Sequence, residues 1–366
     1  MARKSRRVTS KDVARLAGVS RTTVSLVLND VPHARIAPET RRRVLEAARQ
    51  LGYRPNAAAR SLVRQQAMTL GLILCHPPAH VYTDPFLPQV LLGITGALQK
   101  TEYRLLLETV AEPTPGEDYL DLAREKRIDG FIISGPRVDD MALRRLHGEG
   151  VPIVLLGHLP DLDIPSVDVD NVRAAYTAVA HLIRLGHRRI GIITNGPLHY
   201  TASQERLAGY RQALAKHGLP YDPALVVEGN FTAESGEEAM KHLLGLHPRP
   251  TAVFVASDTV ALGALVTLRH EGIHVPTEMA LVGFDDIPLA AYVDPPLTTV
   301  RLPAYELGRE AARLLLALVA GHTPPTTRTV LNTALVVRAS CGALQSLRDP
   351  REKGGETVSD VTGARS

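Results

Sequence analysis

The chain has 366 residues, 45% of them hydrophobic and 22% charged, a composition typical of globular proteins with two or three domains. Its net charge of +4 conceals a strong polarity, because residues 1–66 carry +11 and the remainder carries −7. No apolar stretch follows the basic start MARKSRR, which argues against a signal peptide, and no run of about 18 apolar residues occurs, so no membrane span is expected. We therefore expect a cytoplasmic protein.

The first predicted element is a short helix capped by Thr9. Asp12 lies three positions after Thr9, as in a capping box. The apolar face of this helix is predicted to consist of Val13, Leu16 and Ala17. Gly18 comes directly after it, at a position where a helix stop favours a residue that tolerates positive φ. The pattern therefore predicts a helix that ends in a tight turn.

A second short helix is predicted to begin after Ser20, whose hydroxyl can cap it. Its inward residues are predicted to be Val24, Val27 and Leu28. This spacing leaves Arg21, Thr22 and Ser25 on the outer face near the start of the helix. Two helices joined in this way form a helix-turn-helix, which presents that face to the DNA major groove. The charge of residues 1–66 supports this interpretation, since DNA is a polyanion.

Two further helical segments complete the basic part of the chain. A third helix is predicted from Pro38 to Leu51, with inward residues Val44, Leu45, Ala48 and Leu51. The stretch at 53–66 forms a separate unit in which Asn56 can cap a short helix. Because that helix is too short to persist alone in water, we expect it to fold only against DNA and a second copy of the chain.

From Thr69 onward, apolar strand-like runs alternate with amphipathic helical stretches. The strand runs fall at 70–74, 105–107, 130–133 and 153–156, and then at 190–193, 225–227, 252–256 and 281–284. The alternation predicts buried parallel sheets covered by helices, arranged as two similar α/β lobes. Ligands in such sheets bind beyond the carboxyl ends of the strands, here in a cleft between the lobes.

The order of motifs closely resembles the lactose/galactose-repressor (LacI/GalR) family of bacterial transcription regulators, over about Thr9 to Arg338. The most specific motifs are DVARLAGVSRTTVSLVLN and TRRRVLEAARQLGYRPNAAARSL. Weaker motifs occur after them in the family's order: DGFII, HLIRLGHRRIGII, RLAGYRQAL, TAVFVASDTVALGAL, LVGFDDIPLA and PPLTTV.

The resemblance implies an α/β fold class: an N-terminal all-α helix-turn-helix headgroup and a periplasmic-binding-protein-like type I core of two α/β lobes. It divides the chain into a DNA-binding headgroup at 1–52, a hinge helix at 53–66, and an effector-binding and dimerisation core at 67–340. We expect the polar tail at 341–366 to be disordered.

The resemblance also implies the residues that contact DNA. Arg21 and Thr22 match base-reading positions, where an Arg can bind guanine with two hydrogen bonds. Leu26 stands where lactose-type repressors have an Arg that reads a base, which predicts a different operator sequence. The remaining expected DNA-contacting residues are Thr9, Ser20, Thr23, Ser25, Asn29 and Asn56.

The hinge is expected to act through two residues. Leu62 matches the leucine that family members wedge into the minor groove, where paired wedges kink the duplex. Ala59 matches the small residue that lets two hinge helices approach. An ordinary linker leucine is the alternative interpretation of Leu62.

The match places the effector-binding residues in the core. Arg206 can donate hydrogen bonds to hydroxyls or to an anion, Phe231 offers a flat face to a ring, and Asp285 ends a strand and can accept from hydroxyls. Phe86, Ser257 and Asp258 complete the expected set. The alternatives are a surface arginine, a core phenylalanine and a turn-forming aspartate.

These features predict a regulator, and a repressor in particular, that binds a palindromic double-stranded DNA operator as a homodimer. A small-molecule effector, expected to be a carbohydrate, releases or stabilises the complex. A sugar-binding receptor without a DNA role is the alternative, but it would need an export signal and no basic headgroup. We expect no enzyme activity, cofactor, metal site or membrane partner, because the chain lacks metal-ligand spacing, a nucleophile elbow and a phosphate-binding Gly-rich loop.

Overall fold

The chain divides into two compact units, Met1–Met68 and Thr69–Ser366. The computed structural model describes residues 8–29, 34–53, 66–75, 81, 84–110 and 118–343. The hinge residues Asn56, Ala59 and Leu62, and most of the expected tail, therefore lie outside the described residues. Among the described residues no helix is both long and apolar enough to cross a bilayer.

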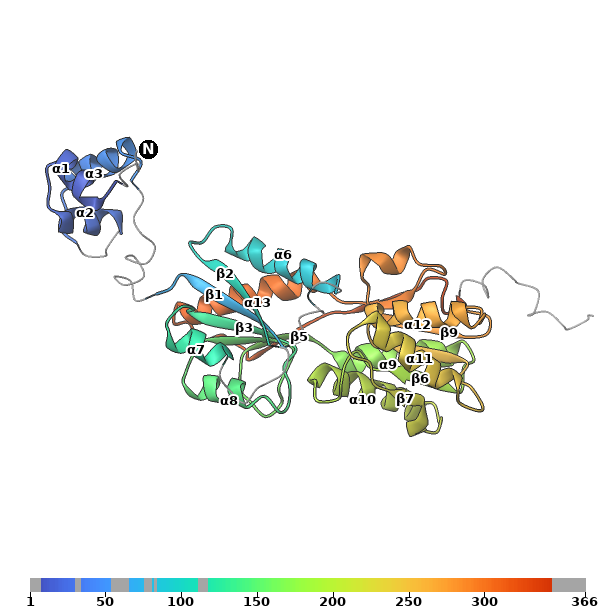
Figure 1. Ribbon diagram of the computed structural model, residues 1–366. Coiled ribbons are helices and arrows are strands. Elements are labelled where there is room, and N and C mark those ends of the chain that lie inside the picture. Colours follow the sequence, from blue (N-terminus) through green and yellow to red (C-terminus); the bar gives the residue numbers. More distant parts are fainter. Residues whose placement is uncertain are drawn as a thin grey trace, which may run out of the picture. The chain divides into compact units, whose positions relative to one another are not determined.

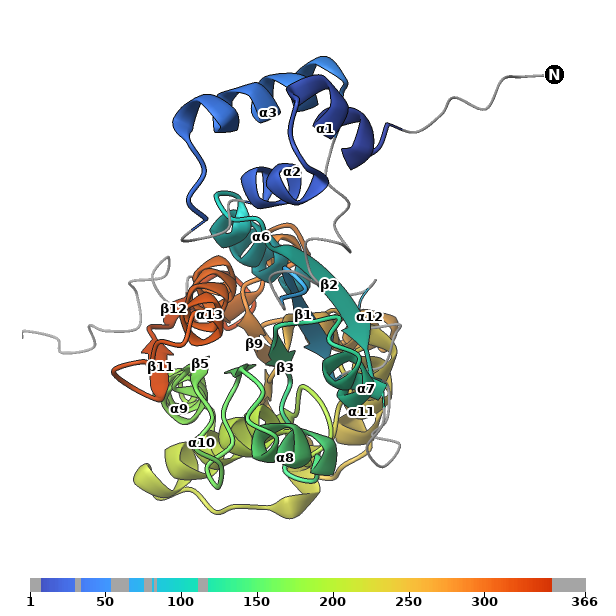
Figure 2. The same cartoon turned by 90° about the vertical axis from the view of Figure 1, so that its left-hand side faces the viewer.

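The first unit contains the three helices that the sequence predicts, α1 (Ser10–Ala17), α2 (Arg21–Leu28) and α3 (Pro38–Gln50) (Figure 2). The Asp12 carboxylate accepts hydrogen bonds from the backbone N–H and the hydroxyl of Thr9, at 3.0 and 2.8 Å. Gly18 ends α1 with φ at 64°, and the Ser20 hydroxyl accepts from the Thr23 N–H at 3.0 Å. The predicted helix-turn-helix is thus confirmed with both of its caps.

Two residues of the predicted apolar faces were assigned wrongly. Leu16 is 52% exposed and Leu45 is 49% exposed, so neither faces the core of this unit. The buried cluster is built instead around Val13, Ala14, Ala17, Val24, Val27, Val44, Ala47 and Ala48. Small alanines fill the inward stripes of α1 and α3, and the larger leucines lie one step around each helix.

The second unit is built on two six-stranded sheets. The first has the order β11-β5-β4-β3-β1-β2 and is parallel throughout. Its strands are β1 (Thr69–Leu74), β2 (Arg104–Thr109), β3 (Gly130–Ser134), β4 (Ile153–Leu156), β5 (Ser166–Val169) and β11 (Arg328–Leu331). The second has the order β12-β10-β9-β8-β6-β7, with only β12 antiparallel. Its strands are β6 (Ile190–Ile193), β7 (Val226–Val227), β8 (Ala252–Val255), β9 (Ala280–Asp285), β10 (Thr298–Arg301) and β12 (Ala334–Val336).

Helices cover both faces of each sheet, as continuous apolar strands require (Figure 1). In the first lobe, one face packs on α6 (Phe86–Leu98) and α13 (Ala304–Val319), and the other on α7 (Asp118–Arg124) and α8 (Met141–Gly148). In the second lobe, α9 (Asn171–Arg184) and α10 (Thr201–Lys216) cover one face. The other face packs on α11 (Ala233–Leu244) and α12 (Asp258–His270). The expected architecture of two α/β lobes is confirmed.

The chain passes between the lobes at three points: from β5 into α9, from β10 into α13, and from β11 into β12. The sequence interpretation missed β5, β10, β11 and β12. These strands are short. Ser, Asp, Thr and Arg interrupt the apolar residues of β5, β10 and β11, and β12 has only three residues, so none of the four gives a long apolar run.

The contact between α6 and α13 depends on two glycines. A Cβ at Gly93 would collide with the backbone oxygen of Tyr305, and a Cβ at Gly308 would collide with the backbone oxygen of Val90. We expect Gly93→Ala to lower the free energy of unfolding by about 1–3 kcal/mol, because backbone must move to admit the methyl group. Denaturant unfolding of the full chain measures this loss.

Gly148→Ala is the matched control. Gly148 ends α8 and nothing lies within 4 Å of the position its Cβ would take. This variant should be neutral or stabilising by up to about 1 kcal/mol, since Ala is the better helix residue. Equal unfolding midpoints for the two variants would contradict the close-approach explanation.

Candidate functional sites

The first candidate site is the exposed start of α2 in the first unit. Arg21 and Thr22 are both exposed, and among the described residues neither side chain has a hydrogen-bond or ion-pair partner. By contrast, Arg15, Arg42 and Arg49 of α1 and α3 pair with acidic residues of their own helices. The side chains predicted to read bases are therefore available for an external ligand.

The other described residues of the expected DNA-contacting set support the local backbone. The hydroxyls of Ser20 and Thr23 lie 2.9 Å apart, and the Asn29 side-chain amide donates to the Ser25 hydroxyl at 3.0 Å. Leu26 is partly buried between these positions. Hydrogen bonds thus fix the side chains of Ser20 and Thr23 on either side of Arg21 and Thr22 in the sequence.

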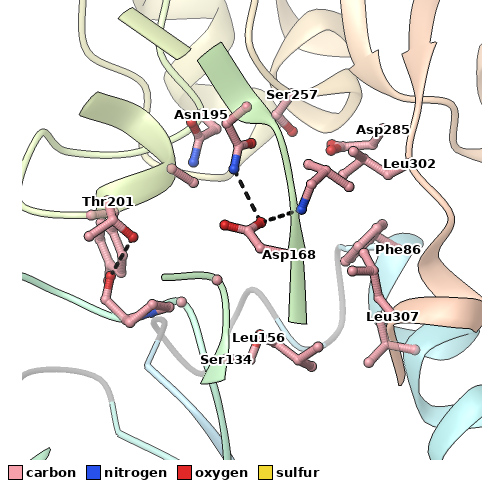
Figure 3. A pocket seen from close by; sticks show the side chains of 18 of the residues that line it. Phe86, Ser134, Leu156, Asp168, Asn195, Thr201, Ser257, Asp285, Leu302 and Leu307 are labelled. Atoms are coloured by element: carbon pink, nitrogen blue, oxygen red, sulfur yellow. Dashed lines mark hydrogen bonds between the residues drawn. The ribbon is translucent and has the colours of Figure 1, made fainter. Parts of the chain in front are cut away.

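The second candidate site is a cavity of the second unit, lined by residues of both lobes (Figure 3). From the first lobe come Leu74, Phe86, Ser134, Leu156 and Asp168, and from the second Asn195, Tyr200, Arg206, Phe231, Ser257 and Asp285. Most of these residues end a strand or lie within two residues of its carboxyl end. The cavity therefore lies where parallel sheets bind ligands, beyond the carboxyl ends of the strands.

Arg206 is the cation of this cavity among the described residues that line it. Its side chain is buried, with a residue exposure of 7%. The Nε atom donates to Asn171 Oδ1 at 3.0 Å, and Nη1 donates to the backbone oxygen of Ala256 at 2.7 Å. The guanidinium also lies 3.8 Å from the centre of the Phe284 ring. The alternative of a solvated surface arginine is thereby excluded.

Asp285 lies beside Arg206, with 3.9 Å between Oδ1 and Nη1. Burial raises the pKa of its carboxyl well above the ordinary value, and Arg206 opposes this effect. The backbone of Asp285 has φ at 117° and that of Phe231 has φ at 62°. Both are left-handed conformations that non-glycine residues adopt at a cost, and such strain is concentrated at functional sites.

Five of the six expected effector residues line the cavity: Phe86, Arg206, Phe231, Ser257 and Asp285. Asp258 does not. Its carboxylate accepts from the Thr299 hydroxyl at 2.7 Å and from the Ile287 N–H at 3.0 Å, and it is fully buried. Asp258 therefore fixes the connection from β9 to β10, and the expectation that it contacts a ligand is dropped.

Sequence reasoning missed Asp168 and Asn171, which lie at the end of β5 and the start of α9. The Asn171 amide nitrogen donates to Asp168 Oδ1 at 3.2 Å and to Glu205 Oε2 at 3.1 Å. Burial, and then the charge of Glu205, raise the pKa of Asp168 to about 7. The missed signal was an acidic residue inside the run Ser166–Val169, which masked the strand.

Loops from the two lobes meet at the rim of the cavity. The Val138 N–H donates to the His199 oxygen at 3.0 Å, and the Thr201 N–H donates to the Pro136 oxygen at 3.3 Å. The Tyr200 hydroxyl donates to the Cys75 oxygen at 2.7 Å, and its ring meets Phe231 edge-on, with 4.9 Å between centroids. Relative movement of the lobes would have to break these contacts.

Two family models match the chain. Residues 9–56 match "Bacterial regulatory proteins, lacI family", and residues 179–341 match "Periplasmic binding protein-like domain". The chain is similar to the HTH-type transcriptional regulator CelR of Thermobifida fusca, with 39% identity over 338 residues, 92% of this chain and 98% of that one.

The chain is also similar to solved structures of transcriptional regulators. A CelR–cellobiose complex has a TM-score of 0.71 and 38% identity, and the match covers 91% of this chain and 100% of that one. The Lac repressor dimer bound to operator and the anti-inducer ONPF has a TM-score of 0.78 and 28% identity, over 92% of this chain and 99% of that one. These similarities extend over the helix-turn-helix unit and both lobes.

Asp168 makes the stability of the protein depend on pH. Its folded pKa of about 7 lies above the ordinary value of about 3.9, so the folded protein retains a proton that the unfolded chain releases. The stabilisation is full below about pH 4 and is lost as the pH rises through 7. We expect Asp168→Asn to raise the melting temperature more at pH 8 than at pH 5.

Asp170→Asn is the matched control for this comparison. Asp170 is exposed and caps α9 by accepting from the Arg173 N–H at 2.9 Å, a role that Asn fills equally well. Other buried carboxyls, Glu205 and Asp285 among them, also have raised pKa values, so the difference between variant and wild type is the quantity to measure. An equal gain at both pH values would contradict the raised pKa.

Proposed function

The chain belongs to the LacI family of bacterial transcriptional regulators, and from this premise we propose that it is a repressor that binds a palindromic operator as a homodimer and whose operator affinity is set by a sugar or sugar derivative. The observation that carries the DNA part of the proposal is the exposed pair Arg21 and Thr22 at the capped start of α2. Such a pair, on a unit with strong positive charge, suits base readout in the major groove.

The homodimer is supported by large apolar side chains that the single chain leaves in solvent. Leu92 on α6 is 63% exposed, and Leu289 and Tyr292 in the connection from β9 to β10 are 50% and 85% exposed. Burying such side chains against a second copy would remove apolar surface from water, which favours association. A dimer also places two helix-turn-helix units on one duplex, which a palindromic operator requires.

The effector part is supported by the cavity between the lobes. Because residues of both lobes line it, a ligand there can favour one arrangement of the lobes over another, and that difference in affinity is what couples two sites. In this proposal the lobe arrangement reaches the operator through the hinge, where Asn56, Ala59 and Leu62 lie. The effector either releases the operator or strengthens binding to it.

Selection of bound sequences from random DNA, with the full chain and a panel of small metabolites, tests the function. We expect a palindromic motif whose recovery changes in the presence of one sugar. A protein that prefers no duplex over scrambled competitor at near-cellular ionic strength would overturn the proposal.

Arg21→Ala should relax sequence preference at one position of each half-site, because the guanidinium would contact a base edge. The loss of discrimination should be about 1–3 kcal/mol. Competition binding with single-base operator variants measures it. Arg49→Ala removes the same charge from α3, where Arg49 pairs with Glu46, and should leave the sequence preference unchanged. Unaltered discrimination by Arg21→Ala would remove this residue from base readout.

Asp285→Asn should leave operator binding intact while the effector no longer changes it, since the amide NH2 that replaces one carboxyl oxygen cannot accept a hydrogen bond from the ligand. Operator titrations followed by fluorescence anisotropy, with and without the effector found by selection, measure both properties on one preparation. An undiminished effector response would place Asp285 outside the ligand contacts.

A further inference from the structure

The cavity between the lobes carries more acidic than basic groups. Among the described residues that line it, the charged side chains are Asp84, Asp168, Asp285 and Arg206. Charges in a site that excludes water interact more strongly than charges in bulk solvent. A ligand that brings a further negative charge would therefore have to enter against this excess, or force protons onto the carboxyls.

The single positive charge of Arg206 can offset only one of these three carboxyl groups. Two of its N–H groups donate to Asn171 and to the Ala256 backbone, and the Asp285 carboxyl lies 3.9 Å away. The remaining N–H groups can still donate to neutral oxygens. The guanidinium thus suits the hydroxyls of a ligand better than a phosphate or a carboxylate.

Asp168 lies in the middle of the cavity in Figure 3 and is 7% exposed. One carboxyl oxygen, Oδ1, accepts from the Val169 N–H at 2.7 Å and from the Asn171 amide at 3.2 Å. The other, Oδ2, accepts no hydrogen bond from the part of the chain that the structure describes. It lies 4.0 Å from the Arg328 guanidinium. One side of a buried carboxylate is therefore held rigidly and the other is available to a ligand.

The surroundings of Asp168 strengthen its negative field. Glu205 shares the Asn171 amide with Asp168, and Arg328 lies 4.0 Å from this second carboxylate as well. Arg328 is over one third exposed, so solvent screens much of its charge. An anionic ligand would meet the Asp168 carboxylate at this wall of the cavity. Glu205, which does not line the cavity, adds a second negative charge nearby, and Arg328 adds one partly screened positive charge.

We propose that Asp168 is a specificity-determining residue, which accepts a hydrogen bond from a ligand hydroxyl and restricts the cavity to neutral polyhydroxylated ligands. Ligands that bear a phosphate or a carboxylate are excluded. This inference rests on the proposed function only in treating the cavity as the effector site.

Matched ligand pairs test the inference by direct calorimetric titration of the full chain without DNA. The probes are cellobiose with cellobionate and glucose with glucose 6-phosphate, measured at pH 8, above the raised pKa of Asp168. We expect the wild-type protein to bind a neutral member and to bind its anionic partner at least tenfold more weakly. Asp168→Asn should bind the neutral sugar about tenfold more weakly, because a hydrogen bond to a charged acceptor is lost. It should also reduce the difference in affinity between the neutral sugar and its anionic counterpart.

Asp170→Asn, which removes a neighbouring exposed carboxylate, should bind like wild type. The melting temperature of Asp168→Asn, which we expect to be higher than that of wild type at this pH, shows whether weaker binding results from a loss of folding. The inference is overturned if wild type binds an anionic member as tightly as its neutral partner, if it binds neither neutral sugar, or if Asp168→Asn keeps full affinity. A neutral sugar that binds but leaves operator affinity unchanged would instead overturn the proposed function alone.

Discussion

The geometry of the core depends on one guanidinium held out of water. Arg206 enters the cavity from α10, and its donors fix Asn171 at the start of α9 and the backbone just after β8. Removing a charge from water is costly unless it is paired and hydrogen-bonded. The buried guanidinium therefore requires its contacts with the Phe284 ring, the Asp285 carboxyl and the Ala256 oxygen. The strained φ of Asp285 is consistent with this demand, since its carboxyl reaches Arg206 from a position that costs backbone energy.

This arrangement ties ligand binding to the relation between the lobes. Asp168 belongs to a strand of the first sheet, yet its carboxyl is held by Asn171, which also receives the Arg206 donor from the second lobe. A ligand that touches Asp168 and Arg206 therefore contacts both lobes beside a point where the chain crosses between them. A difference in those contacts between two lobe arrangements is the only means by which the ligand can shift the equilibrium between them.

Periodicity and capping residues were enough to predict the main elements from the sequence. Thr9, Asp12, Gly18 and Ser20 specify the ends of α1 and α2 by local hydrogen bonds, and the long apolar strands specify the two lobes.

Leu16 and Leu45 were misplaced because hydrophobicity alone does not say which side of a helix small alanines occupy. The short strands at the crossings were missed, and Asp168 with them. The burial of β5 and β10 comes from neighbouring strands and helices rather than from apolar residues of their own, and β11 and β12 are partly exposed edge strands. Asp258 was misjudged for a related reason. A carboxylate that follows a strand can accept hydrogen bonds from a ligand or from a neighbouring turn, and the sequence does not show that Ile287 and Thr299 lie close enough to donate to it.

The role of each carboxylate in the core depends on how many of its oxygens accept hydrogen bonds from the protein itself. Asp258 has both oxygens occupied by internal donors and stabilises the fold. Asp168 lines the cavity with one oxygen occupied, and its other oxygen accepts no hydrogen bond from the described residues. A carboxylate whose hydrogen bonds are complete gains nothing from a ligand, whereas a buried carboxylate with an open oxygen retains part of its desolvation cost until a donor arrives. Ligand hydroxyls can supply that donor, and this incomplete solvation makes Asp168 a residue of recognition rather than of folding.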